Sequence, residues 1–90
     1  MLESKVKIVN QLGLHARAAA QLVRLASTFE SKITLKRADN SVIADAKSIL
    51  SVLTMAARKG IEIILIVDGA DEEKAIKSVE EIFKNGFGED

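Results

Sequence analysis

His15, the only histidine of the chain, stands where a helix is predicted to begin, and Arg17 follows two residues later. Apolar residues then recur at helical spacing, which predicts an amphipathic helix from about residue 16. The first N–H groups of a helix have no intrahelical partner, so those of Ala16, Arg17 and Ala18 could bind an anion. Arg17 is poorly placed for helix stability, because the helix dipole is already positive at that end. A bound anion would remove this conflict.

The imidazole of His15 adds a nucleophile to this predicted anion site. Positive surroundings favour neutral imidazole near pH 7, and neutral imidazole can attack phosphorus. The nucleophile, the N–H donors and the guanidinium together predict a site for a phosphoryl group. The residues alone leave a second interpretation open, in which His15 is a surface side chain without a function. A metal site is disfavoured, because the chain has no cysteine and no second histidine.

Composition narrows the class of protein further. Ninety residues are expected to form a single domain, 1–90, with one small core. The 13 basic residues are balanced by 13 acidic residues, whereas a nucleic-acid-binding protein usually has a basic excess. No apolar run is long enough to span a membrane, and residues 1–10 lack the apolar stretch of a signal peptide. We therefore expect a cytoplasmic monomer without membrane insertion.

Hydrophobic periodicity predicts the elements that must position the site. Alternation predicts strands over 3–9, 32–37, 42–44 and 61–67, and helical spacing predicts helices from residue 16, over 46–58 and from residue 71 to Gly86. The strand over 61–67 is apolar on nearly both faces, which favours a central position. The order β-α-β-β-α-β-α predicts a two-layer, open-faced α/β sandwich with three helices on one face of a four-stranded sheet. Glu89 and Asp90 are expected to form a frayed acidic tail.

Two short motifs resemble those of the HPr family, the histidine phosphocarriers of the bacterial phosphoenolpyruvate-dependent phosphotransferase system. Gly13–Arg17 (GLHAR) resembles the phosphohistidine motif, and Ala46–Leu50 (AKSIL) resembles the regulatory-serine motif. The resemblance implies that His15 accepts phosphate on Nδ1 from phosphorylated enzyme I and passes it to an enzyme IIA-type protein. Arg17 would then steady the phosphate. The resemblance also implies an antiparallel sheet in the order 1-4-2-3, and no metal or organic cofactor.

Two features depart from the usual family pattern. Ala18 stands where family members usually have proline, which suits the first turn of a helix because its missing N–H has no partner there. Alanine restores one donor near the anion and loosens the turn. The segment between the two motifs, with 37–45 in its hairpin, looks slightly longer than in the sugar-branch carriers. Together with the ending FKNGFGED, it resembles the nitrogen-branch carriers called NPr. The sugar and nitrogen branches therefore both remain open.

The predicted helix over 46–58 carries a candidate docking surface. At about 100° per residue, Leu50 falls on the polar side of this helix, whereas Ile49 and Leu53 share the apolar arc with Val52 and Ala56. The family resemblance places this helix beside His15. We therefore expect enzyme I to contact Arg24, Ile49, Leu50 and Leu53.

Ser48, at the start of the same predicted helix, has two interpretations. Its hydroxyl could cap the helix. By resemblance, it could instead be a regulatory site for an HPr serine kinase/phosphatase.

Three functions compete at this point. The first is a phosphocarrier, which is consumed and regenerated rather than acting as a free-standing enzyme. The second is a regulatory binding module whose phosphorylation state is read by partner proteins. The third is an interaction module without phosphotransfer, which the presence of both His15 and Arg17 disfavours.

Overall fold

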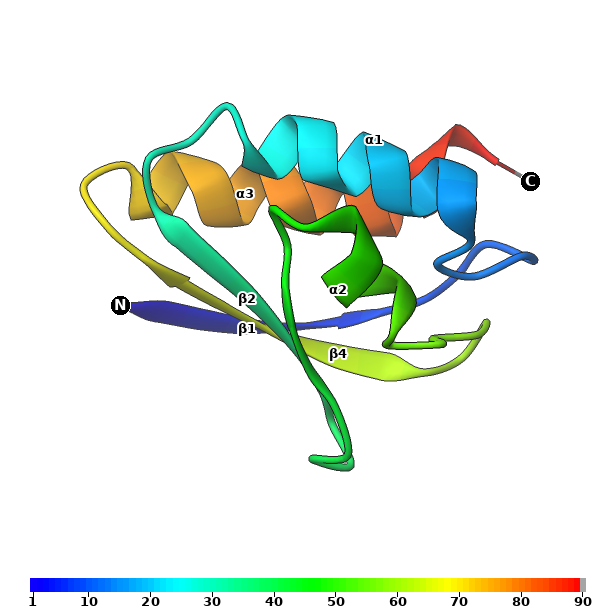
Figure 1. Ribbon diagram of the computed structural model, residues 1–90. Coiled ribbons are helices and arrows are strands. Elements are labelled where there is room, and N and C mark those ends of the chain that lie inside the picture. The colour runs from blue at the N-terminus through cyan, green and yellow to red at the C-terminus, as the bar shows by residue number, and fades with distance from the viewer. Residues whose placement is uncertain (90) are drawn as a thin grey trace.

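One antiparallel sheet carries helices on a single face, and its other face is open (Figure 1). The computed structural model describes residues 1–89. Its strand order, β1-β4-β2-β3, confirms the expected topology and the open-faced fold class. The elements are β1 (Leu2–Lys7), α1 (Ala16–Ala26), β2 (Lys32–Arg37), β3 (Ile43–Asp45), α2 (Ile49–Leu53), β4 (Glu62–Asp68), α3 (Glu72–Lys84) and the 3₁₀ turn η1 (Gly86–Gly88).

Strand β4 lies between β1 and β2, as its apolar sequence predicts. Alternate residues of this strand, Ile63, Leu65 and Val67, are buried beneath the helices. Ile64 and Ile66 lie between them on the open face and are only half-buried. These two isoleucines are half-buried because β1 and β2 flank them on either side. A central strand can therefore be apolar on both faces.

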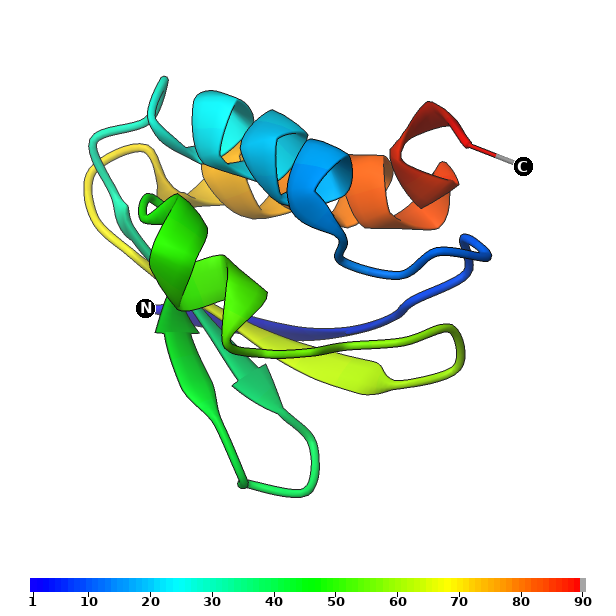
Figure 2. The same ribbon diagram turned by 45° about the vertical axis from the view of Figure 1, so that its right-hand side comes forward.

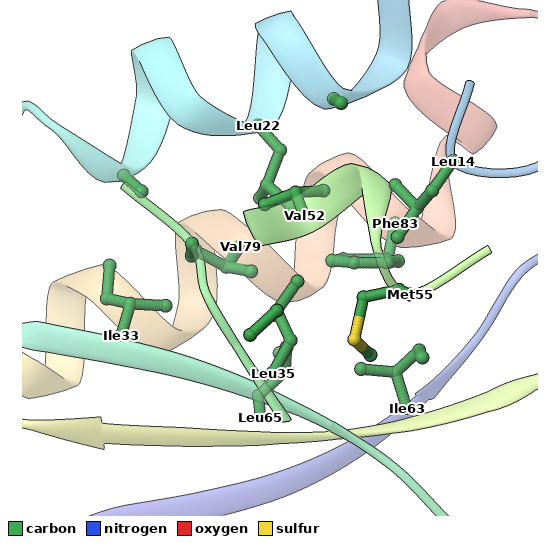
Figure 3. Packing of buried hydrophobic residues seen from close by; sticks show 14 of the residues in the cluster. Leu14, Leu22, Ile33, Leu35, Val52, Met55, Ile63, Leu65, Val79 and Phe83 are labelled. Carbon is green, nitrogen blue, oxygen red and sulfur yellow. The ribbon is translucent and has the colours of Figure 1, made fainter. Parts of the chain in front are cut away.

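The core fills the space between the sheet and the helices. Leu22 of α1 and Phe83 of α3 point toward the sheet residues Leu35 and Ile63 (Figure 3). Helices α1 and α3 lie next to each other above the sheet, whereas α2 covers the side nearer β3 (Figure 2). The start of α1 and the end of the chain thereby come to the same end of the molecule.

The second helix is much shorter than predicted. The sequence predicts a helix over 46–58, but α2 covers only Ile49–Leu53. The chain cannot continue as a right-handed helix because Ala56 has a φ of 47°. Arg37 stabilises the segment that follows α2 by donating a hydrogen bond from Nη1 to the Met55 carbonyl, at 3.0 Å. The periodicity predicts too long a helix because Met55 is buried in the core although α2 already ends at Leu53.

The helical phase within α2 is also partly wrong. Val52 is fully buried, as predicted, and Leu50 is exposed, as predicted. Ile49 and Leu53, which the apolar arc places in the core, are exposed as well. A helix of little more than one turn at the edge of the layer buries one narrow stripe, so these three apolar side chains share the outer surface.

Candidate functional site

The loop after β1 sets where α1 begins. Gly13 has a φ of +66°, and a Cβ at this position would lie 2.3 Å from the carbonyl oxygen of Ala57. The next residue, Leu14, donates its N–H to that same oxygen at 2.9 Å. Only glycine fits a left-handed position in such close contact with backbone. This contact fastens the start of α1 to the segment that follows α2.

His15 is the N-cap of α1. Its extended backbone, with φ −77° and ψ 178°, lets the half-buried imidazole fold over the first helical turn. Nδ1 accepts a hydrogen bond from the N–H of Arg17 at 3.3 Å. An acceptor nitrogen has a lone pair and no proton, so the proton of the neutral ring lies on Nε2. The nitrogen that can act as nucleophile therefore faces the positive end of α1.

The other ring nitrogen of His15 contacts a residue that the sequence patterns do not indicate. Nε2 lies 2.5 Å from Oε2 of Glu89, and the same oxygen accepts a hydrogen bond from Nη2 of Arg17 at 3.2 Å. The second carboxylate oxygen accepts from Nδ2 of Asn10 at 3.1 Å. The donation from Asn10, supported by His15 and Arg17, lowers the pKa of Glu89 below its ordinary value.

Glu89 is thus not part of a frayed tail, contrary to the expectation from sequence. Its side chain is only 11% exposed. The preceding turn is anchored because buried Phe87 packs edge-on against Phe83, with ring centroids 5.1 Å apart. A phenylalanine between two glycines after the last helix is the one sequence signal that could have predicted this anchor. Asp90, the other residue of the expected tail, lies outside the described residues.

Arg17 and the first-turn amides are the groups of the site that could bind an anion. The Arg17 side chain is 66% exposed, so most of its guanidinium N–H groups can reach a ligand. The amides of Ala16 and Ala18 lie in the same first turn. The side chain of Ala18 is fully buried beneath the helix, whereas its N–H belongs to the helix end. The carboxylate of Glu89 lies beside the Arg17 guanidinium. Its negative charge offsets the unfavourable position of a cation at the start of a helix.

The expected docking residues fall on two neighbouring helices. Arg24 is exposed in the last turn of α1, which packs against α2. Leu50 is 75% exposed, and it shares the outer side of α2 with Ile49 and Leu53. The apolar patch and the cation therefore lie on two helices that pack against each other, and neither takes part in the contacts around His15.

Ser48 caps α2. Its backbone is extended, with φ −123° and ψ 115°, and its Oγ accepts a hydrogen bond from the N–H of Ser51 at 3.3 Å. The capping interpretation is confirmed, since the hydroxyl satisfies one of the free amides at the helix start. The side chain is half-buried and directly precedes the apolar patch.

The open-faced sheet, with His15, Arg17 and the first-turn amides of α1 together at one end, indicates a small phosphoryl carrier. A family model described as the HPr component phosphorylation site of the phosphotransferase system matches residues 2–85. A phosphocarrier protein HPr from Xylella fastidiosa is 44% identical and covers 100% of this chain and 99% of its own. A phosphocarrier protein NPr from Proteus mirabilis is 38% identical, with 96% and 94% covered. The crystal structure of HPr from Thermoanaerobacter tengcongensis superposes with a TM-score of 0.92 at 39% identity, covering 100% of this chain and 99% of the other.

The chain belongs to the HPr family. It is a phosphocarrier of the phosphotransferase system rather than a free-standing enzyme, as the sequence motifs predict. Among residues 1–89, no helix is both long enough and apolar enough to cross a membrane.

Proposed function

We propose that the chain carries its phosphoryl group on Nδ1 of His15, receiving it from phosphorylated enzyme I and passing it to a histidine of an enzyme IIA-type protein. The observation that carries this proposal is the hydrogen bond from the Arg17 N–H to Nδ1, which requires a lone pair on that nitrogen. The lone pair lies at the N-terminus of α1, where anions are stabilised. Nε2 faces the Glu89 carboxylate, an acceptor, which favours the proton on this nitrogen and disfavours it as the nucleophile.

The transfer follows from this geometry. The lone pair of Nδ1 attacks the phosphorus of the donor phosphohistidine, and the donor N–P bond breaks as the new N–P bond forms. The first-turn amides and the exposed guanidinium of Arg17 then bind the phosphoryl oxygens. Onward transfer is the same step in reverse, with the acceptor imidazole as nucleophile. No water needs to take part in either direction.

Intact mass after incubation with enzyme I and phosphoenolpyruvate tests the acceptor residue. We expect one phosphoryl group per chain, lost in acid and retained in base, as is typical of phosphoramidates. His15→Ala should remain folded, because the side chain is not part of the core, and should accept nothing. An acid-stable adduct, or acceptance by the alanine variant, would show that phosphate goes elsewhere.

We further propose that enzyme I docks on the exposed side of α2 and the neighbouring end of α1. Three exposed apolar side chains on a helix of five residues support this proposal, because folding does not explain them. Arg24 adds a cation beside them for an acidic partner surface. The contact set is Arg24, Ile49, Leu50 and Leu53.

Phosphorylation of Ser48 by an HPr serine kinase/phosphatase is a second, regulatory proposal. It is supported by the position of Ser48 at the edge of the apolar patch, where added charge would act on docking. In this scheme the phosphorylation state is read by partner proteins. Relatives named HPr and NPr both match nearly the whole chain, so the sugar and nitrogen branches are both candidates. A monomer in the cytoplasm suits a carrier that moves between partners. Comparing transfer to sugar-branch and nitrogen-branch IIA proteins tests the branch.

A further inference from the structure

We propose that Glu89, held in place by Asn10, is a positioning residue that keeps the imidazole proton on Nε2 throughout the phosphoryl relay. This inference rests on the proposed function, since it assigns the partner of the nitrogen opposite the one that reacts. Glu89 acts through His15 and does not touch the phosphoryl group. The acceptor on Nδ1 and the proton on Nε2 would then be fixed by two different elements, α1 and the C-terminal segment.

Asn10 orients the carboxylate through the NH₂ side of its amide, which donates to two acceptors, whereas its Oδ1 is buried without a hydrogen-bond partner among residues 1–89. The residue is 1% exposed, and its Nδ2 donates to the Gly13 carbonyl at 2.8 Å and to Oε1 of Glu89 at 3.1 Å. Both neighbours are acceptors, so only the NH₂ side of the amide can face them. The buried side chain of Asn10 thereby connects the loop before His15 to the carboxylate of Glu89, although the two residues are 79 positions apart.

The backbone supports the same arrangement. Gly86 packs so closely on the loop that an added Cβ would lie 3.3 Å from Cβ of Asn10. Phe87 is 3% exposed and anchors the following turn on α3. The carboxylate of Glu89 therefore approaches His15 from a packed segment and not from a loose chain end, which limits the entropy lost in forming the contact.

The chemical consequence concerns the leaving group. Attack by Nδ1 leaves a ring with phosphorus on Nδ1, a proton on Nε2 and one positive charge. The carboxylate of Glu89 accepts that proton in a hydrogen bond and balances the charge. When the phosphoryl group passes on, the N–P bond electrons return to Nδ1 and the ring departs as neutral imidazole, with no proton moved. If Nε2 had lost its proton, the leaving group would be imidazolate, which leaves far less readily.

The same carboxylate also leaves Arg17 able to bind phosphate. Only one nitrogen of the guanidinium, Nη2, contacts Glu89, and the side chain remains mostly exposed. The other N–H groups can bind phosphoryl oxygens while the contact between Glu89 and His15 persists. Binding of the anion and retention of the proton are therefore compatible in one complex.

Nitrogen-15 NMR of the His15 ring in the unphosphorylated protein tests the inference directly, at a pH where the imidazole is neutral. We expect the wild-type shifts to be widely separated, as is typical of a proton fixed on Nε2. Glu89→Ala should bring the two shifts closer, because both tautomers become populated. Glu89→Gln should retain the separation, since its amide oxygen can still accept the proton. Asn10→Ala should give a smaller change in the same direction as Glu89→Ala, provided its NMR spectrum shows a folded chain.

Transfer kinetics supply the second readout, with a IIA-type protein as acceptor. We expect Glu89→Ala to lower kcat by about 10- to 100-fold, by analogy with residues that orient metal-binding histidines, with KM little changed. Glu81→Gln, on the exposed side of α3, is the matched control and should behave as wild type. Unchanged ring shifts together with an unchanged kcat in Glu89→Ala would overturn the inference. Failure of the proposed function would look different, because wild type would then accept no phosphate on His15 whatever its ring shifts.

Discussion

At the scale of single residues, the chemistry depends on which nitrogen of His15 carries the proton. The amide of Arg17 and the carboxylate of Glu89 act on opposite sides of the ring and enforce the same tautomer. Neither contact alone would fix both the direction of attack and the charge of the ring. The ring that we propose as the phosphate acceptor is therefore held in one tautomer by its neighbours before any partner binds.

Arg17 offers the clearest residue-level prediction. Arg17→Gln should slow phosphorylation by enzyme I at least about tenfold, because it removes a charge-assisted hydrogen bond to the phosphoryl oxygens. The melting temperature should change little, since the side chain is 66% exposed. Initial rates and a thermal melt measure the two effects separately. Lys74→Gln, which also removes an exposed cation but on α3, should leave the rate unchanged. Equal rates for wild type and Arg17→Gln would limit Arg17 to holding Glu89.

The sequence predicts half of the residues around the ring. His15 and Arg17 lie two residues apart at the start of one helix, so their chemistry is visible in a local motif. Asn10 and Glu89 are not, because the contact between them spans 79 residues and the contact of Glu89 with the ring spans 74. Periodicity reports which face of an element a residue occupies, and it contains no information about which distant segment meets that face.

At the scale of elements, α2 presents apolar side chains that its short length cannot bury. Leu50→Asp should leave the free energy of unfolding within about 0.5 kcal/mol of wild type, as is usual for surface changes. The KM for enzyme I should rise, because the apolar contact is lost and a carboxylate replaces it. Denaturant melts and steady-state phosphorylation measure the two quantities.

Ile43 provides a matched control for that prediction. It is 66% exposed on β3, similar to Leu50, and its alternation with buried Ala44 places it on the open side of the sheet. Ile43→Asp should leave the KM for enzyme I unchanged. A comparable rise in KM for both variants would point to a general effect of added charge and not to a docking surface on α2.

Ser48→Asp tests the regulatory proposal within the same element. Aspartate is as good an N-cap as serine, so the melting temperature should be kept. Phosphorylation of His15 by enzyme I below saturation should slow, because the new charge lies beside the apolar patch and must be desolvated on docking. Ser48→Asn caps without charge and should react as wild type does. If all three proteins react equally fast, Ser48 is only a cap.

The elements themselves could be predicted to different degrees. Alternation and helical spacing identify the four strands and the positions of α1 and α3 closely. The order of the strands did not follow from periodicity, which is local, and came only with the family resemblance. The sequence predicts too long an α2 because Met55 and Ala57 are buried in the irregular segment that follows it. A hydrophobic pattern cannot distinguish such a buried irregular segment from a helix.

At the scale of the whole molecule, Gly13 connects the loop that carries His15 to the segment after α2. Gly13→Ala should destabilise the protein by about 1–3 kcal/mol, because it combines a left-handed φ with a Cβ overlapping the Ala57 carbonyl. Gly60→Ala is the control, since Gly60 also has a positive φ of +92° but no atom within 4 Å of its added Cβ. Chemical denaturation of both variants separates the overlap from the backbone strain. An equal loss of unfolding free energy in both variants would mean that the loop around Gly13 shifts to relieve the overlap with Ala57.

A single acceptor nitrogen, as we propose for His15, would also limit how fast the carrier can cycle between its partners. Donor and recipient would each have to reach Nδ1 of His15, so the two complexes would exclude each other and the kinetics would be ping-pong. Every cycle then includes two dissociation events, and a tighter complex with either partner would lengthen its residence time and reduce flux. A small docking surface, such as the one proposed on α2, suits rapid cycling. The carrier transfers more phosphoryl groups in a given time when it binds each partner only briefly.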